Sequence, residues 1–214
     1  MTARQPRRRW LGMRLLGVGA MNSPRYDPAG LLIAWSGRRV AFDGGGAAVP
    51  RTPVDAWLVT DDRSELIADI RRHCRALHIA PTMGNWNTDA VTISALDVVH
   101  TSHRTVGYLI EANGRRAVWA PEFWQFPAWS AGADLMFADA AGWRQPIRFV
   151  GGVGGHASVT DTARQALDAG VRRLVFAHIG RACIKARDAG LEPTFGKWGI
   201  EGRSYRLPIG VDQR

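Results

Sequence analysis

Short apolar runs separated by turn residues dominate the pattern of hydrophobic and polar positions along the chain. Apolar or alternating runs of four to eight residues predict strands. Ser36-Gly37 and Asn113-Gly114 each separate two such runs by two residues, which predicts two hairpins. The strands expected from these runs are residues 13–18, 31–35, 38–42, 54–60, 91–96, 106–111, 116–120, 135–138 and 173–177.

Two segments show the 3.6-residue period of an amphipathic helix. Apolar side chains recur at helical spacing within residues 64–77, and residues 159–169 form a second such segment that ends at Gly170. Each predicted helix follows a run of strands. This order favours two packed sheets with helices outside over a parallel doubly wound sheet.

The composition is that of one globular domain. The chain has 214 residues, of which 46% are hydrophobic and 22% charged, so it can bury its own core. Arg14 interrupts the apolar stretch 11–21, which is shorter than the roughly 20 residues of a membrane helix. Cys74 and Cys183 indicate neither a disulfide framework nor a cysteine metal cluster. We therefore expect a cytoplasmic protein with no membrane partner.

Part of the net charge of +9 is concentrated at the N-terminus. Four arginines lie within residues 1–12, which we interpret as a basic leader that is disordered or precedes a true start at Met13. A single domain is then expected over residues 13–214. The remaining charge gives weak support to a nucleic-acid binder, whose binding would depend steeply on salt.

Six landmarks follow one another in the order of a known family. They are Leu16-Gly17-Val18-Gly19, Phe42-Asp43-Gly44-Gly45, Leu58-Val59-Thr60, His103 before Gly107-Tyr108, Gly155-His156-Ala157-Ser158 and Phe176-Ala177-His178-Ile179. With these landmarks, residues 13–182 resemble the metallo-β-lactamase superfamily, and within it the branch of ribonuclease Z and related cyclic phosphodiesterases. The resemblance implies an α/β fold, a four-layer αββα sandwich. It also implies a metal-dependent hydrolase acting on a phosphoester or related ester bond.

The metal-binding motif of this family is altered in the chain. The family carries Thr-His-x-His-x-Asp-His, whereas this sequence reads Thr60-Asp61-Asp62-Arg63-Ser64-Glu65-Leu66. Residue by residue, Asp61 and Arg63 take the places of the first two histidines, and Glu65 that of the aspartate. Arginine has no free lone pair and cannot bind a cation. The motif therefore does not favour the usual pair of ions.

The remaining candidates predict one divalent metal ion, Zn, Mn or Fe, or none. The resemblance places Glu122 at the bridging aspartate and His178 at the last ligand. His100 and His103 compete for a further ligand position, and we favour His103 because it is nearer to Gly107-Tyr108. Asp61 completes this set of oxygen and imidazole ligands.

Three interpretations of the altered motif remain open. In the first, Asp61 and Glu65, or the ion, hold the attacking water. In the second, Arg63 fills the vacated metal position and pairs with Glu122 and Asp61, which leaves a metal-free pseudoenzyme or binding module. In the third, Asp61 and Glu65 only cap the following helix.

His156 is the expected proton donor or acceptor, as the resemblance implies. Its ordinary pKa near 6.5 allows transfer in both directions near neutral pH. We expect Gly154, Gly155 and Arg63 to seat the anionic group of a small-molecule or phosphoester substrate near a helix N-terminus. The alternative is that His156 caps that helix and the glycines only form a turn. Asp139 either reaches the site or caps the residues that follow it, and we favour the cap.

Overall fold

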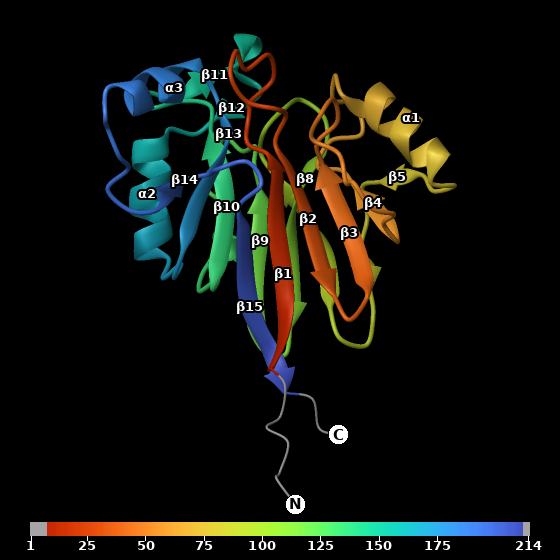
Figure 1. Cartoon of the computed structure of the whole chain (residues 1–214). Helices are drawn as coiled ribbons and strands as arrows, with labels where there is room; N and C mark the ends of the chain where they lie inside the picture. Colours follow the sequence, from red (N-terminus) through yellow and green to blue (C-terminus); the bar gives the residue numbers. More distant parts are fainter. Residues whose placement is uncertain (1–7, 212–214) are drawn as a thin grey trace, which may run out of the picture.

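The structure is a computed structural model that describes residues 8–211, and it consists mainly of two mixed sheets (Figure 1). The strands of the first sheet are β1 (Arg8–Gly17), β2 (Gly30–Trp35), β3 (Arg38–Asp43), β4 (Ala56–Leu58), β5 (Pro81–Thr82) and β15 (Ser204–Val211). Their order across the sheet is β15-β1-β2-β3-β4-β5. Strands β1, β2, β3 and β15 pair antiparallel, while β4 runs parallel to both of its neighbours.

The second sheet contains the parallel strands at whose carboxyl ends the candidate active site lies. Its strands are β6 (Trp86–Asn87), β7 (Thr92–Val98), β8 (Thr105–Ala112), β9 (Arg115–Ala120), β10 (Leu135–Ala140), β13 (Leu174–Ile179) and β14 (Lys197–Trp198). The order is β14-β13-β10-β9-β8-β7-β6, and β9, β10, β13 and β14 run parallel. Two further strands, β11 (Ile147–Arg148) and β12 (Gly155–His156), form a small antiparallel pair.

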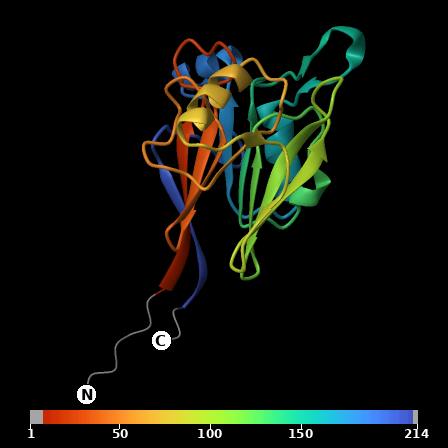
Figure 2. The same cartoon turned by 90° about the vertical axis from the view of Figure 1, so that its right-hand side faces the viewer.

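Helices cover the outer faces of the two sheets. Helix α1 (Ile67–Ala76) packs against the first sheet through an apolar cluster that includes Trp57, Ile70 and Cys74. Helices α2 (Val159–Asp168) and α3 (Arg181–Asp188) lie on the side of β10 and β13 (Figures 1 and 2). The main core fills the space between the sheets. The predicted four-layer αββα sandwich is thus confirmed.

The helices are short. The longest α-helices in the described part of the chain have ten residues, and none is long and apolar enough to cross a membrane.

Both predicted hairpins are confirmed, with turns of the expected kind. Ser36 and Gly37 have φ of 44° and 83°, and Asn113 and Gly114 have φ of 47° and 71°. Positive φ at both central residues characterises the type I′ turn, whose twist matches that of the flanking strands. The turns join β2 to β3 and β8 to β9.

The first strand begins earlier than the sequence pattern indicated. Strand β1 starts at Arg8, so the boundary expected at residue 13 lies inside the strand. Trp10, Leu11 and Gly12 pair with β15, and Leu11 is 1% exposed. Residues 8–12 are therefore part of the domain rather than of a leader, because a partner strand almost 200 residues later covers them. The rest of the predicted leader, residues 1–7, lies outside the described residues.

Candidate active site

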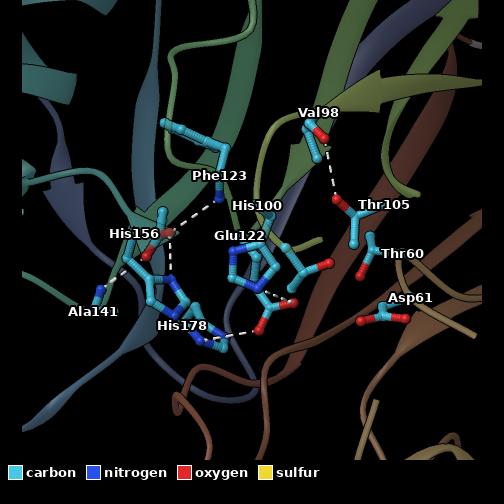
Figure 3. Close-up of polar contacts among 12 residues, drawn as sticks. Thr60, Asp61, Val98, His100, Thr105, Glu122, Phe123, Ala141, His156 and His178 are labelled. Atoms are coloured by element: carbon cyan, nitrogen blue, oxygen red, sulfur yellow. Dashed lines mark hydrogen bonds and ion pairs between the residues drawn. The ribbon is translucent and has the colours of Figure 1, made fainter. Parts of the chain in front are cut away.

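Polar side chains gather where the parallel strands of the second sheet end. Glu122 follows β9, Asp139 lies near the end of β10, and His178 lies near the end of β13. Because these three strands are parallel neighbours, their carboxyl ends meet at one edge of the sheet. Ligands of α/β proteins bind at such edges. Figure 3 shows the side chains of Glu122 and His178 turned toward each other.

Three histidine rings and Glu122 form the centre of the cluster. The ring centroids of His156 lie 4.7 Å from His100 and 5.2 Å from His178, the latter pair stacked. The Glu122 carboxylate faces two of the rings, with Oε1 3.1 Å from His178 Nε2 and Oε2 3.7 Å from His100 Nε2. Burial lowers the pKa of His178 despite the opposing effects of Glu122 and Asp139.

Asp139 and His156 form a buried ion pair beside this cluster. His156 Nδ1 donates to Asp139 Oδ2 at 2.7 Å, and Asp139 also accepts the backbone N–H groups of Phe123 and Ala141. Burial acts to raise the pKa of Asp139, but the charge and hydrogen bond of His156 outweigh it, so that the pKa lies below its ordinary value. Burial likewise acts to lower the pKa of His156, but Asp139 raises it to about 8. Both groups are therefore charged at neutral pH.

His100, and not His103, lies with Glu122 and His178. The preference for His103 is therefore not supported by the geometry. His100 is held by Gly155 in two directions: its Nδ1 donates to the Gly155 carbonyl at 2.9 Å, and Gly155 N–H donates to the His100 carbonyl at 2.9 Å. Since a carbonyl only accepts, Nδ1 carries the proton and Nε2 is left facing Glu122.

The two glycines before His156 serve close backbone packing. A Cβ at Gly154 would lie 2.1 Å from the His100 carbonyl oxygen, and one at Gly155 would lie 1.9 Å from that of Ile147. Both residues have φ near 150°. Because the N–H of Gly155 is already bonded to His100, it is not free for a substrate anion. The expected anion-binding role of Gly155 therefore lacks a donor.

His156 does not cap the helix that follows it. Ser158 is the N-cap of α2, and its hydroxyl accepts the Asp161 N–H at 3.1 Å. The interpretation of His156 as a helix cap is therefore wrong. The cap expected of Asp139 holds in part, since it binds Ala141 N–H, but its carboxylate also holds His156.

Asp61 and His103 bind each other on the opposite side of the site. His103 Nε2 lies 2.9 Å from both Asp61 carboxylate oxygens, and Asp61 Oδ1 accepts the backbone N–H of Arg63 at 2.8 Å. The Arg63 side chain is exposed and pairs with neither Glu122 nor Asp61 within residues 8–211. The hypothesis that Arg63 fills the vacated metal position is therefore wrong.

The capping interpretation of Asp61 and Glu65 is also wrong. Helix α1 begins at Ile67 with Leu66 as N-cap, and no side chain caps it. Glu65 is exposed and instead lines a pocket of about 50 Å³, together with Glu122 and His178. A space of this size holds a few water molecules or an ion. Of the altered motif, Thr60 and residues 64–66 line this small pocket, and of the three histidines His178 does.

Asp43 lines the same pocket, although no pattern in the sequence predicts a chemical role for it. Its Oδ1 accepts Thr60 N–H at 2.7 Å and the Thr60 hydroxyl at 3.0 Å, and its Oδ2 accepts Trp119 Nε1–H at 2.7 Å. Burial raises the pKa of this carboxyl to about 7 against these hydrogen bonds. The only sequence signal was its place in the landmark Phe42-Asp43-Gly44-Gly45.

This raised pKa predicts a pH dependence of stability. Between about pH 4 and pH 7 the folded state holds a proton on Asp43 that the unfolded state has lost, so stability falls as the pH rises. We expect the ionisation of Asp43 to lower the free energy of unfolding by about 2–3 kcal/mol between pH 5 and pH 7.5. Urea unfolding at both pH values should show a smaller fall for Asp43→Asn than for the wild type.

Asp55 provides the control for this measurement. Hydrogen bonds and the charge of Arg38 outweigh its burial and keep the pKa of Asp55 below its ordinary value, so it is ionised in both states throughout this window. Asp55→Asn should therefore keep the pH dependence of the wild type. Equal pH dependence in wild type and Asp43→Asn would contradict the prediction.

His100, Glu122 and His178 provide donor atoms for one metal ion, although they are not arranged as a formed site. In the described part of the chain, no three His, Cys, Asp or Glu side chains are arranged as a formed metal site. Two imidazole nitrogens nevertheless face the carboxylate of Glu122, and two histidines with one carboxylate suit a single divalent ion. The carbonyl of Gly155 fixes the His100 tautomer that leaves Nε2 available, as carbonyls that accept from the other ring nitrogen do for metal-binding histidines. The residues therefore fit one ion and not a pair.

Comparisons with known proteins agree with this fold. A family model described as "Beta-lactamase superfamily domain" matches residues 58–179. The metallo-beta-lactamase fold protein YhfI of Bacillus subtilis is 14% identical, with a TM-score of 0.73 over 93% of this chain and 100% of YhfI. A diphosphatase of the PhnP family is 13% identical, with a TM-score of 0.68 over 94% of this chain and 98% of the diphosphatase.

A third structure, the short form of human tRNase Z, is 13% identical, with a TM-score of 0.58 over 92% of this chain and 100% of that protein. No curated protein sequence matches the chain. At these identities the structural likeness shows the fold alone, whereas the family model covers more than half of the chain. The chain therefore belongs to the metallo-β-lactamase superfamily, a superfamily of metal-dependent hydrolases.

Proposed function

We propose that the protein hydrolyses phosphoester bonds at the pocket between the histidine cluster and the altered motif. The Asp139–His156 ion pair carries this proposal, because it stacks a charged imidazole on His178, which faces Glu122, at the carboxyl ends of three parallel strands. A fully buried carboxylate that orients a histidine is the usual arrangement for directed proton transfer. Two structural relatives are named a diphosphatase and a tRNase Z, which supports a phosphorus–oxygen bond as the target.

Each residue of the site has a distinct part in this proposal. His156 donates a proton from Nε2 to the leaving oxygen, because Asp139 holds Nδ1 and keeps the ring protonated. Glu65 and Glu122 accept hydrogen bonds from the attacking water in the pocket. His100, Glu122 and His178 would hold one divalent ion, Zn, Mn or Fe, which when bound supplies a Lewis acid and lowers the pKa of water.

Gly154 and Asp61 have supporting parts. Gly154 lets the backbone come close to the His100 loop, and Asp61 fixes the His103 ring through a hydrogen bond. Neither binds the ion in this proposal. The protein is expected to act in the cytoplasm.

A metal-free binding module is the second candidate. The observation that favours it is the absence of histidine from residues 61–66, where the resemblance implies metal ligands, since removing direct metal ligands usually abolishes tight metal binding. In this case the same pocket would hold an anionic small molecule without cleaving it.

Metal content and hydrolysis together test the two candidates. Wild type, Glu122→Gln and His178→Ala are each loaded with Zn²⁺, Mn²⁺ or Fe²⁺ and assayed with bis-p-nitrophenyl phosphate. We expect about one ion per wild-type chain, and loss of both ion and activity in the two variants. Glu111→Gln, at a half-exposed carboxylate of β8, is the matched control and should behave as wild type. If the wild-type protein neither binds an ion nor hydrolyses the ester, the hydrolase proposal is wrong and the metal-free binding module is the remaining candidate.

A further inference from the structure

A large groove lies away from the proposed active site, at the other end of the same strands. It has a volume of about 930 Å³ and is lined by the starts of β10 and β13, by residues 193–197, and by residues 203–206 of the β15 region. Its wall at Leu174 is four residues before His178 on β13, which is about 13 Å along a strand. The groove is therefore distinct from the catalytic pocket.

The lining of this basic groove is strongly cationic. Its charged residues are Arg172, Arg173, Lys197, Arg203 and Arg206, all exposed, and no Asp or Glu is among the described residues that line it. The five cations come from three separate segments of the chain. Their accumulation in one groove raises the local positive potential, which attracts anions.

Most of this charge is not neutralised by the protein. Arg172 pairs with Asp134 at 3.1 Å, and Arg173 donates to the Arg206 backbone carbonyl at 3.2 Å. Lys197, Arg203 and Arg206 make no ion pair with any residue between 8 and 211. Since no carboxylate of residues 8–211 neutralises these three charges, an anionic ligand is the natural partner for them.

Two aromatic residues interrupt the cations. The Tyr205 ring packs edge-on against Phe137, with centroids 5.3 Å apart, and the Arg203 guanidinium carbon lies 5.9 Å from the Tyr205 centroid. Tyr205 is thus engaged by the protein. Phe195 lines the groove and is half-buried. Aromatic rings set among cations are the arrangement that binds single-stranded nucleic acid, because bases stack on rings while cations hold phosphates.

We infer that the basic groove binds a single-stranded nucleic acid, with Lys197, Arg203 and Arg206 on its phosphates and Phe195 under a base. The spread of the cations favours a chain of phosphates over a single anion. Arg203 and Arg206 are three residues apart, about 10 Å along extended chain. The groove then acts as a binding surface remote from the site of hydrolysis.

Fluorescence anisotropy with a labelled 12-nucleotide single-stranded RNA, from 25 to 200 mM NaCl, tests this inference. Lys197→Gln/Arg203→Gln should weaken binding at least tenfold at 25 mM. Each lost phosphate contact reduces the slope of log K against log salt by about 0.7, so the slope should flatten by about 1.4. Phe195→Leu should weaken binding without changing the slope, because stacking releases no counterions.

Arg71→Gln/Arg75→Gln is the matched control, because it removes two exposed arginines from α1 on the other side of the molecule (Figure 1). It should bind the RNA within twofold of wild type. Glu122→Gln should also bind as wild type, so that the outcome does not depend on the proposed hydrolysis. Equal weakening in the groove and control variants, or no wild-type binding at 25 mM, would overturn the inference. Equally tight binding of ADP would overturn the assignment to a strand.

Discussion

His156→Ala is expected to lower the rate of phosphodiester hydrolysis by about 10²–10⁴-fold, the usual contribution of a positioned acid or base. Asp139 fixes one ring nitrogen and keeps the imidazole charged, so alanine removes the proton donor itself. The effect should appear in kcat, because the proton moves in the transition state and contributes little to ground-state binding. Steady-state kinetics with bis-p-nitrophenyl phosphate measure it.

A substrate with a better leaving group sharpens the test of His156. Such a group needs less help from an acid, so the loss in His156→Ala should shrink as the pKa of the leaving alcohol falls. His78→Ala is the control, since His78 is exposed on the loop after α1. A uniform loss across leaving groups would assign His156 a structural role, and an unchanged rate would exclude it from the reaction.

The strands joined by tight turns were predictable because their signals are local. The I′ turn at Asn113-Gly114 and the alternating runs around it specify β8 and β9 without reference to the rest of the chain. The limits of β1 were not predictable in this way. Residues 10–12 are part of the strand because they pair with β15. No local pattern in the first 20 residues predicts this pairing.

The choice between His100 and His103 shows the same limit at the site. The two residues are three positions apart, and each lies at a plausible distance before Gly107. Two hydrogen bonds with Gly155, 55 residues later, distinguish His100 from His103. His100 Nδ1 donates to the Gly155 carbonyl, and the Gly155 N–H donates to the His100 carbonyl. Spacing within a motif cannot report such a contact.

The contact of Asp139 with His156 was not predictable for a related reason. The local sequence predicts that Asp139 caps the residues that follow it, and its hydrogen bond from Ala141 N–H agrees with this prediction. Its other oxygen accepts from Phe123 and His156, which belong to different segments brought together at the ends of β9, β10 and β12. The chemical role of the residue is thus visible only once the parallel strands are aligned.

Asp139→Ala is therefore expected to cost about 3–5 kcal/mol of folding free energy, the usual effect of breaking one partner out of a buried ion pair. The variant leaves the His156 imidazolium without its counter-charge and two buried N–H groups, of Phe123 and Ala141, without acceptors. Urea unfolding at pH 7 measures the change. Asp97→Ala, at an exposed pair with Arg104, should change stability by at most about 0.5 kcal/mol.

Asp139→Asn separates the charge of Asp139 from its shape. Asparagine keeps one acceptor in place, so it should lose less stability than alanine, while the neutral side chain no longer raises the pKa of His156. The Asn variant should then be folded and still impaired in hydrolysis of substrates with poor leaving groups. Full activity in a folded Asp139→Asn protein would mean that the ion pair serves stability alone, because the charge that keeps His156 protonated would be absent without consequence.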